Sequence, residues 1–450
     1  MTAEPQAPEN GMRHAGSTAT RTREPAAGGA AMLAHACEPV PSGDVSGTPP
    51  STAPAQRSKP RLVGIDTARG IALLGMVAVH NIDATNADGT LSLAWTLSAG
   101  KSAALFALLA GVGIAFASGG RRRPTGRTWT ANAASLAVRA LLIGAVGLTI
   151  GYLVPDDYAA VILPYYALLF VLAIPLLALS IRALIGLAAA IAVAMPVLSH
   201  LLRAGTDATT PGNLTFTDLA DHPVQVARDL ALTGLYPALP WMAYLCVGLA
   251  VGRAVLSARR TVVSFTLIGA ALAAASTAVS WLLLDVLGGR GRLEETALQT
   301  MTESDIARVL QSGWSGVTPT DTGWWLATMA PHSSTPLDLA YTIGVALAVL
   351  GVCILIGRTT TTLLRPLAAA GSMTLTLYCL HLLMLSWPVM PGGPTGFLIQ
   401  TAVLIAFALI WSRTHTRGPF EEIVAEAAGA ARRKVLGAAP AADRGARSSA

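Results

Sequence analysis

The stretch Arg61–His80, RLVGIDTARGIALLGMVAVH, decides the fold, because it is apolar enough to cross a membrane and yet carries an acid, a base and a terminal histidine. A spanning helix needs about 20 mostly apolar residues, and ionisable groups inside one are costly and usually face a bundle interior or a wet cavity. At about 100° per residue, Asp66, Arg69 and His80 share one stripe of this helix. The rise of about 1.5 Å per residue separates Arg69 from His80 by about 16 Å. One helix therefore presents polar groups near both sides of the membrane.

The composition of the whole chain agrees with a membrane protein. Of 450 residues, 53% are hydrophobic and 12% are charged, and the mean hydropathy is +0.55, as in polytopic membrane proteins. Membrane lipid is thus an expected partner. The net charge of +6 does not predict nucleic-acid binding, because the arginines lie in short loops that orient helices. Four scattered cysteines without CxxC spacing predict neither a disulfide framework nor a bound metal.

Recurring apolar segments predict an all-α, polytopic integral membrane protein of about ten transmembrane helices. They lie at about residues 63–82, 92–117, 131–153, 159–180, 182–201, 235–256, 262–286, 337–357, 363–388 and 395–412. Residues 1–60 are rich in Ala, Pro, Gly, Ser and Thr and are expected to form a disordered cytoplasmic tail. No apolar core with a cleavage site precedes residue 60, so we expect no removable signal peptide. Residues 61–417 then form the transmembrane domain, and residues 418–450 a second cytoplasmic tail.

Basic residues are concentrated in alternate loops. By the positive-inside rule these loops face the cytoplasm, which places both termini inside and the protein in the cell membrane as a multi-pass protein. His80, His332 and His381 then fall toward the outer side, whereas Asp66 and Arg69 lie toward the cytosol. The basic loop residues are Arg57, Lys59, Arg61, Arg121, Arg122, Arg123, Arg127, Arg182, Arg253, Arg259, Arg260, Arg358, Arg365, Arg413, Arg417, Arg432, Arg433 and Lys434.

Several segments resemble a known family of membrane enzymes. RLVGIDTARGIALLGMVAVHN at 61–81, followed by GKSAALFALLAGVGIAF at 100–116, resembles the opening of bacterial relatives of heparan-alpha-glucosaminide N-acetyltransferase, a transmembrane acyltransferase family. LYPALPWMAYLCVGLAVGR at 235–253, AAGSMTLTLYCLHLLML at 369–385 and GPFE at 418–421 resemble the second half of related bacterial membrane proteins. Small and apolar residues dominate these later segments, so they are less specific than the first.

The resemblance implies an acyltransferase-like domain over residues 61–417. In that family, acetyl-CoA is used from the cytosolic side and the acetyl group goes to an amino sugar across the membrane. A histidine on the far side is implicated, and the resemblance does not select which histidine of this chain takes that role.

Asp66 and Arg69 are the candidate donor-binding residues, because the planar donor fork of Arg69 suits a phosphate of an entering acyl donor. The alternative is that the two side chains, three residues apart, neutralise one another on one helical turn and anchor the helix. Both interpretations remain open at this point.

His80 is the first candidate catalytic residue, because a histidine near neutral pKa could take a proton from an acceptor hydroxyl or amine. An interfacial histidine bonded to Asp83 or Asn81 is an equal alternative. His381 shares a helical stripe with Thr374 and Tyr378, and is either a second base or part of an interhelical hydrogen bond. Lys101 either lines a polar cavity beside His80 or extends to the membrane interface.

These observations favour a transmembrane acyltransferase that moves an acyl group, acetyl in the first instance, from cytosolic acyl-CoA to an extracytoplasmic glycan or glycolipid. Acetyl-CoA or another acyl-CoA is the expected donor, and the carbohydrate is the expected acceptor. The main alternative is a transporter or exporter of a small polar or lipid-linked molecule, in which the same charges line the path. A non-catalytic partner in envelope assembly is a third interpretation. The sequence leaves open whether the protein forms a homo-oligomer.

Overall fold

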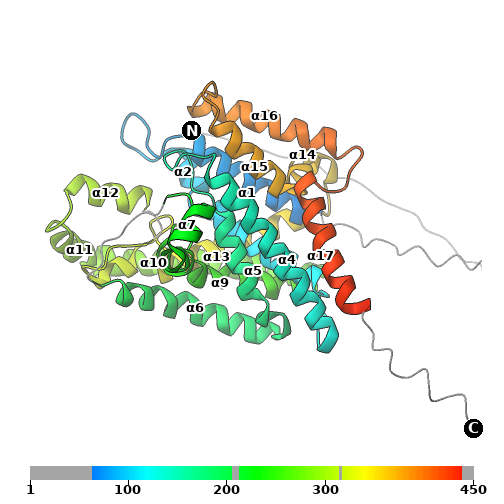
Figure 1. Ribbon diagram of the computed structural model, residues 1–450. Helices are drawn as coiled ribbons and strands as arrows, with labels where there is room; N and C mark the ends of the chain where they lie inside the picture. The colour runs from blue at the N-terminus through cyan, green and yellow to red at the C-terminus, as the bar shows by residue number, and fades with distance from the viewer. Residues whose placement is uncertain (1–62, 205–211, 314–316, 438–450) are drawn as a thin grey trace, which may run out of the picture. The chain divides into compact units, whose positions relative to one another are not determined.

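The computed structural model describes residues 63–204, 212–313 and 317–437, all within the unit formed by residues 60–450. The tail predicted to be disordered, over residues 1–60, lies outside the described residues, as do residues 438–450 of the predicted C-terminal tail. Helices dominate the described part and no β-strand occurs in it (Figure 1). The predicted all-α fold class is therefore confirmed.

The first half of the described chain consists of helices and short helical turns. Their bounds are α1 Val63–Asn81, α2 Leu93–Ser98, α3 Lys101–Ala117, α4 Gly126–Gly151, α5 Leu163–Ala173, η1 Pro175–Ala178, α6 Ile181–Leu202, α7 Phe216–Asp221, α8 Pro223–Arg228 and η2 Asp229–Thr233. Proline residues begin α8 and η1 because a proline N–H is not needed in a first turn.

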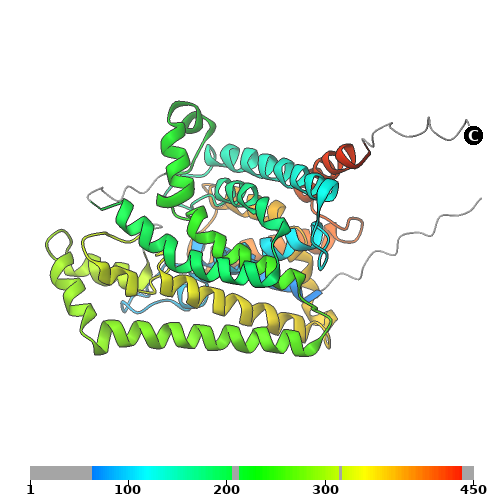
Figure 2. The same ribbon diagram turned by 90° about the horizontal axis from the view of Figure 1, so that it is seen from below.

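The second half continues in the same way and ends with a long amphipathic helix. The bounds are α9 Ala238–Arg253, α10 Arg259–Trp281, η3 Leu282–Val286, α11 Gly289–Ala297, α12 Glu303–Ser312, η4 Gly323–Ala327, α13 Pro336–Ile356, α14 Thr361–Gly371, α15 Thr374–Leu385, α16 Gly393–Trp411 and α17 Pro419–Gly437. Figure 2 shows α10 and α13 side by side, in agreement with their extensive contacts.

Length and composition qualify many of these helices as membrane spans. Within residues 63–204, 212–313 and 317–437, seven helices are long and apolar enough to cross a membrane, or nine if each of two bent pairs counts as one span. The bent pairs are residues 223–253 and 361–385. The fourth predicted span, residues 159–180, is not among these nine; it contains only the short helix α5 and the turn η1, because Pro175 interrupts the helix.

The segment predicted as one span at residues 363–388 is broken inside the apolar run. Helix α14 ends at Gly371, α15 begins at Thr374, and the two are bent by 69°. Gly371 lies against the start of α1, where a Cβ atom would collide with the backbone carbonyl oxygen of Asp66. The break thus lets a helix end approach α1 more closely than a side chain would allow.

Helix α1 lies at the centre of the packing, in contact with α3, α13, α14, α15 and α16. Its apolar side chains Ile65, Leu73 and Val77 are buried in the main hydrophobic core. We call the end of the bundle at which α1 begins, with Asp66 and Arg69, the arginine end. The opposite end, with His80, is the histidine end.

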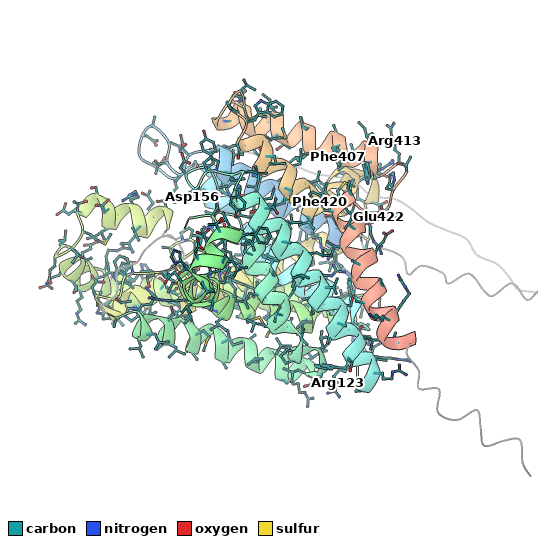
Figure 3. The ribbon with its side chains drawn as sticks, viewed as in Figure 1. Arg123, Asp156, Phe407, Arg413, Phe420 and Glu422 are labelled. Atoms are coloured by element: carbon teal, nitrogen blue, oxygen red, sulfur yellow. The ribbon has the colours of Figure 1, made fainter. Side chains whose placement is uncertain are left out.

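The loops on either side of α4 carry opposite charges. Figure 3 places Arg123 beyond the first residue of α4 and Asp156 beyond its last residue. At the arginine end, Arg358 donates a hydrogen bond from Nη2 to the backbone oxygen of Leu256 at 2.6 Å, which joins two loops that the charge pattern predicted to share a side. Which side faces the cytoplasm stays a prediction.

Helix α17 packs along α4, as Figure 1 shows. Arg432 donates from Nε to Oδ1 of Asn132 at 3.1 Å, and Val424 and Ala428 are buried. Residues 419–437, predicted from the sequence to belong to a cytoplasmic tail, therefore pack against the transmembrane helices.

Candidate functional site

A cavity of about 600 Å³ lies between α1, α3, α4, α5, α15 and α17. Its volume is within the usual range for small-molecule and cofactor sites. Most of its lining is apolar, from residues such as Phe106, Leu109, Ile143 and Phe170. Polar and charged side chains gather at two places on the wall, and these decide what the cavity can bind.

Three arginines line the arginine end of the cavity: Arg69 on α1, Arg139 on α4 and Arg417 before α17. The positive charges of Arg417 and Arg69 act on Arg139, so both guanidinium groups lie close enough to repel that of Arg139. Among the residues that the structure describes, neither Arg139 nor Arg417 forms an ion pair or a side-chain hydrogen bond. Unpaired guanidinium groups in a largely apolar cavity are suited to a phosphate or carboxylate ligand.

The sequence left open whether Asp66 and Arg69 neutralise one another or bind a ligand, and the geometry is compatible with both. Arg69 donates from Nη1 to Oδ1 of Asp66 at 3.0 Å, and the Asp66 side chain is only 7% exposed. The other terminal nitrogen of Arg69, Nη2, lies beside Gly113 of α3, where the chain lines the cavity. Asp66 itself is not part of the lining. The carboxylate therefore holds the guanidinium in place, and Arg69 is the member of the pair that a ligand can reach.

The cavity wall also contains Glu421, the last residue of the GPFE segment. Its Oε1 accepts hydrogen bonds from the backbone N–H of Leu375 at 2.6 Å and of Thr376 at 3.2 Å, and its Oε2 accepts from the Thr376 hydroxyl at 2.6 Å. These groups belong to the first turn of α15, so a carboxylate from α17 caps that helix. Gly418 is required nearby, because a Cβ there would come within 2.6 Å of the Met373 Cβ.

Tyr166, Tyr378 and Met76 line the part of the cavity nearer the histidine end. The Tyr378 hydroxyl accepts from the backbone N–H of Ile162 at 3.2 Å and donates to the carbonyl of Ala160 at 3.4 Å. The Tyr166 hydroxyl is buried and has no hydrogen-bond partner among the described residues. An unpaired buried hydroxyl at a cavity wall offers a ligand a hydrogen bond that the protein does not use itself.

His80 and His381, far apart in the sequence, are in direct contact at the histidine end. Nδ1 of His80 lies 2.9 Å from Nε2 of His381, and the two rings are stacked with centroids 5.2 Å apart and planes 2° apart. Nδ1 of His381 lies 2.6 Å from Oε1 of Gln400 on α16. Neither histidine is part of the cavity lining. Met76 and Tyr378 do line the cavity, and they lie one helical turn before His80 and His381, respectively.

Lys101, the third candidate catalytic residue, faces α13 instead of the histidine pair. Its Nζ lies 5.6 Å from the ring centroid of Tyr341, and its charge acts on the buried Asp338. In the described part of the chain, no hydrogen bond or ring contact of Lys101 involves His80 or His381. This geometry favours a structural ion interaction over direct contact with a substrate.

His332 lies close to both Lys101 and His80, in a loop where it and Ser334 have positive φ angles of 61° and 51°. Such conformations are strained for residues other than glycine. Its ring packs edge-on against Tyr236, with centroids 5.6 Å apart. Burial, together with the charge of Lys101, lowers the pKa of His332 to about 4, so its ring is neutral at physiological pH.

Two residues of the site, Arg139 and Gln400, were not predicted from the sequence. Arg139 stands alone in the apolar run of α4, and an isolated arginine inside a span is itself a signal of a functional site. Gln400 carried no such signal, because an uncharged amide in a span is an ordinary residue for interhelical hydrogen bonding. The described residues contain no group of three or more His, Cys, Asp or Glu side chains placed to hold a metal ion.

The fold and the cavity define a class: a polytopic helical membrane protein with a cationic ligand cavity beside a histidine pair. Residues 61–282 match the model of the family described as heparan-alpha-glucosaminide N-acetyltransferase, catalytic. The match confirms the resemblance drawn from the sequence, and it makes these residues similar to the catalytic domain of a transmembrane acetyltransferase. It covers α1 to α10 and hence Arg69, Arg139, Tyr166 and His80. No curated protein matches the chain.

Proposed function

We propose that this protein takes an acetyl group from acetyl-CoA, or a related acyl-CoA, at the arginine end and transfers it to an extracytoplasmic glycan or glycolipid. The family match supports acetyl transfer across a membrane. The observation that carries the proposal is the cavity that joins three arginines at one end to the neighbourhood of the His80–His381 pair at the other. Under the positive-inside rule, the arginine end and both termini are cytoplasmic.

The arginine end suits the donor. A coenzyme A nucleotide carries several phosphate charges at one end of a long, flexible pantetheine chain. Arg69, Arg139 and Arg417 would bind these phosphates through charge-assisted hydrogen bonds, and the apolar wall would pack against the pantetheine. The unpaired Tyr166 hydroxyl would donate to a carbonyl oxygen of that chain. Asp66 acts on the donor indirectly, by holding Arg69.

His80 is the proposed general base, with His381 as its neighbour. An acceptor amine or hydroxyl attacks the thioester carbonyl carbon, and His80 takes the proton that the nucleophile loses. The tetrahedral intermediate then breaks its C–S bond, the acetyl group stays on the acceptor, and the thiolate of CoA recovers a proton. No metal is needed for these steps.

The geometry implies one further requirement. Met76 and Tyr378 line the cavity and precede His80 and His381 by about one helical turn, or about 5.4 Å. The acyl end of the donor would therefore extend past Met76 and Tyr378 to reach His80. Helix α1 would then bind the donor through Arg69 near one end and supply the base His80 at the other.

Calorimetry of acetyl-CoA binding to the purified protein in detergent is the direct test. We expect saturable binding that weakens by about 10- to 100-fold in Arg69→Ala, the loss expected for one charged hydrogen-bond partner. Arg182→Ala is the matched control, because Arg182 is exposed and lies outside the cavity lining. Absence of binding in the folded wild-type protein would overturn the proposal.

A transporter remains the competing function, and the two bent helix pairs favour it, since broken helices bind substrates in many transporters. In those proteins a free helix N-terminus meets the substrate, whereas Glu421 occupies the first turn of α15 here. Reconstitution in vesicles separates the functions. Acetyl transfer requires acyl-CoA and the histidines, transport responds to an ion gradient without acyl-CoA, and a non-catalytic partner tolerates the loss of both histidines.

A further inference from the structure

A continuous chain of hydrogen bonds connects a backbone carbonyl of α1 to His80. Asn81 donates from Nδ2 to the carbonyl oxygen of Val77 at 2.8 Å, and Gln400 donates from Nε2 to Oδ1 of Asn81 at 3.0 Å. Gln400 Oε1 then faces Nδ1 of His381 at 2.6 Å, and His381 Nε2 faces Nδ1 of His80 at 2.9 Å. His381 and Gln400 are completely buried and Asn81 is 7% exposed, so water cannot replace a missing partner.

The donors and acceptors along this series of hydrogen bonds follow from its first bond, between Asn81 and the Val77 carbonyl. A backbone carbonyl oxygen can only accept, so the Asn81 group beside Val77 must be the NH₂ group. The Asn81 carbonyl oxygen is therefore the atom that faces Gln400, and it needs a donor, which only the Gln400 NH₂ group provides. The Gln400 carbonyl oxygen is left facing His381.

The same hydrogen-bond argument fixes the tautomers of both histidines. Because Gln400 presents an acceptor, Nδ1 of His381 must carry the proton, and in a neutral imidazole the other nitrogen, Nε2, is then an acceptor. His80 must donate to it from Nδ1. Neutral His80 consequently has a free lone pair on Nε2, which no described residue hydrogen-bonds.

We infer that Asn81 and Gln400 are positioning residues, which set the tautomers of His381 and His80 so that Nε2 of His80 is the basic atom at the histidine end. The inference deepens the proposed function, since it names the atom that takes the acceptor proton. Partners beyond the reacting histidine commonly fix its tautomer and orientation in this way. When His80 Nε2 gains a proton, the ring becomes an imidazolium whose Nδ1–H still donates to His381.

Two substitutions disturb the chain in different ways. Gln400→Met keeps the length of the side chain but removes both amide groups, so the tautomer of His381 is no longer set. Asn81→Leu removes the acceptor that orients Gln400, so the amide can turn its NH₂ group toward His381. His381 would then carry its proton on Nε2 and donate to His80 Nδ1, which leaves the proton of His80 on Nε2.

Nitrogen NMR of protein labelled with ¹⁵N-histidine, in detergent near neutral pH, reports the tautomer directly. The signals of His80 and His381 are identified by their loss in His80→Ala and His381→Ala. We expect an unprotonated Nε2 on both rings of the wild-type protein, a reversed tautomer in Asn81→Leu, and mixed tautomers in Gln400→Met. Ser386→Ala is the control, because Ser386 lies just beyond α15 and its hydroxyl bonds the Leu382 carbonyl and no other group of the described residues.

Acetyl transfer by the same variants gives the functional readout. We expect Gln400→Met and Asn81→Leu to lower the transfer rate by about 10²-fold, the low end of general-base contributions, while acetyl-CoA still binds. Retained donor binding shows that the variants are folded. A wild-type His80 protonated on Nε2, or unchanged tautomers in both variants, would overturn the inference. Because the NMR result does not depend on acyl transfer, failure of the proposed function is recognised separately, by the absence of donor binding.

Discussion

The arginine end and the histidine end of this protein handle polar groups in opposite ways. At the arginine end, Arg139 and Arg417 line a cavity without an ion-pair partner among the described residues. At the histidine end, His381 and Gln400 are fully buried and each is hydrogen-bonded on both sides. The difference indicates two tasks, because binding an anion needs donors kept free, whereas proton transfer needs a base with a fixed tautomer.

The energetic costs of the two ends differ accordingly. Arg139 lies close to Arg69 and Arg417 without an ion-pair partner of its own among the described residues. Like charges repel one another and destabilise the empty protein, and a bound anion would relieve this repulsion. A neutral hydrogen-bonded network has no such need, since a satisfied buried network makes its side chains rigid. Ligand binding should thus stabilise the arginine end far more than the histidine end.

We expect the largest effect on the proposed difference between the two ends from a substitution of His80. His80→Ala should lower acetyl transfer by about 10²- to 10⁴-fold, the contribution of a general base, because the free Nε2 lone pair is lost. Steady-state kinetics with radiolabelled acetyl-CoA would measure the rate, and calorimetry would show unchanged donor affinity. Undiminished transfer would remove His80 from the reaction and would make the histidine end purely structural.

Arg139 tests the opposite end. Arg139→Ala should weaken acetyl-CoA binding by about 10-fold or more, as expected when a charged hydrogen bond worth about 1.5–3 kcal/mol is lost. The effect should shrink at high salt, because ions screen the attraction. Titrations at two ionic strengths would measure both. Equal affinity in the variant would mean that the arginine cavity does not receive the donor phosphates.

Glu421 joins the two ends, because it lines the arginine cavity and caps α15, the helix that carries His381. Glu421→Gln should lower the free energy of unfolding by about 1 kcal/mol, the usual value of an N-terminal helix cap. Donor affinity should be kept or increased, since one negative charge leaves the cavity. Thermal unfolding would detect the first effect, with the exposed Glu422→Gln as control; a loss of donor binding in Glu421→Gln would contradict the structural role.

The smallest effect is expected at His332. Its pKa of about 4 in the folded protein lies below the ordinary value of about 6.5, so between these values the unfolded chain binds more protons. Stability that is present above pH 6.5 should therefore decline as the pH falls toward 4. His332→Asn, which tolerates a positive φ, should reduce this decline by a few degrees in Tm. The exposed His222→Asn is the control, and equal pH profiles in all three proteins would refute the assignment.

Much of the fold followed from local sequence. The apolar runs predicted the helices because backbone groups in a membrane must be satisfied within a helix, and the runs at 63–82, 182–201 and 395–412 match α1, α6 and α16 within a few residues. The break between α14 and α15 was not predicted, because Ser372 and Met373 lie in a run that is apolar enough to continue as a helix. Contact with α1 and the cap from Glu421 decide it.

The candidate site divides in the same way. The sequence alone determined that Asp66, Arg69 and His80 lie on one stripe of one helix, because helical periodicity places residues a few positions apart on one face. Only the tertiary structure brought His381 to His80, Gln400 to His381, and Arg139 and Arg417 to Arg69. These partners lie on other helices, and their approach depends on how the helices pack, which no local pattern specifies.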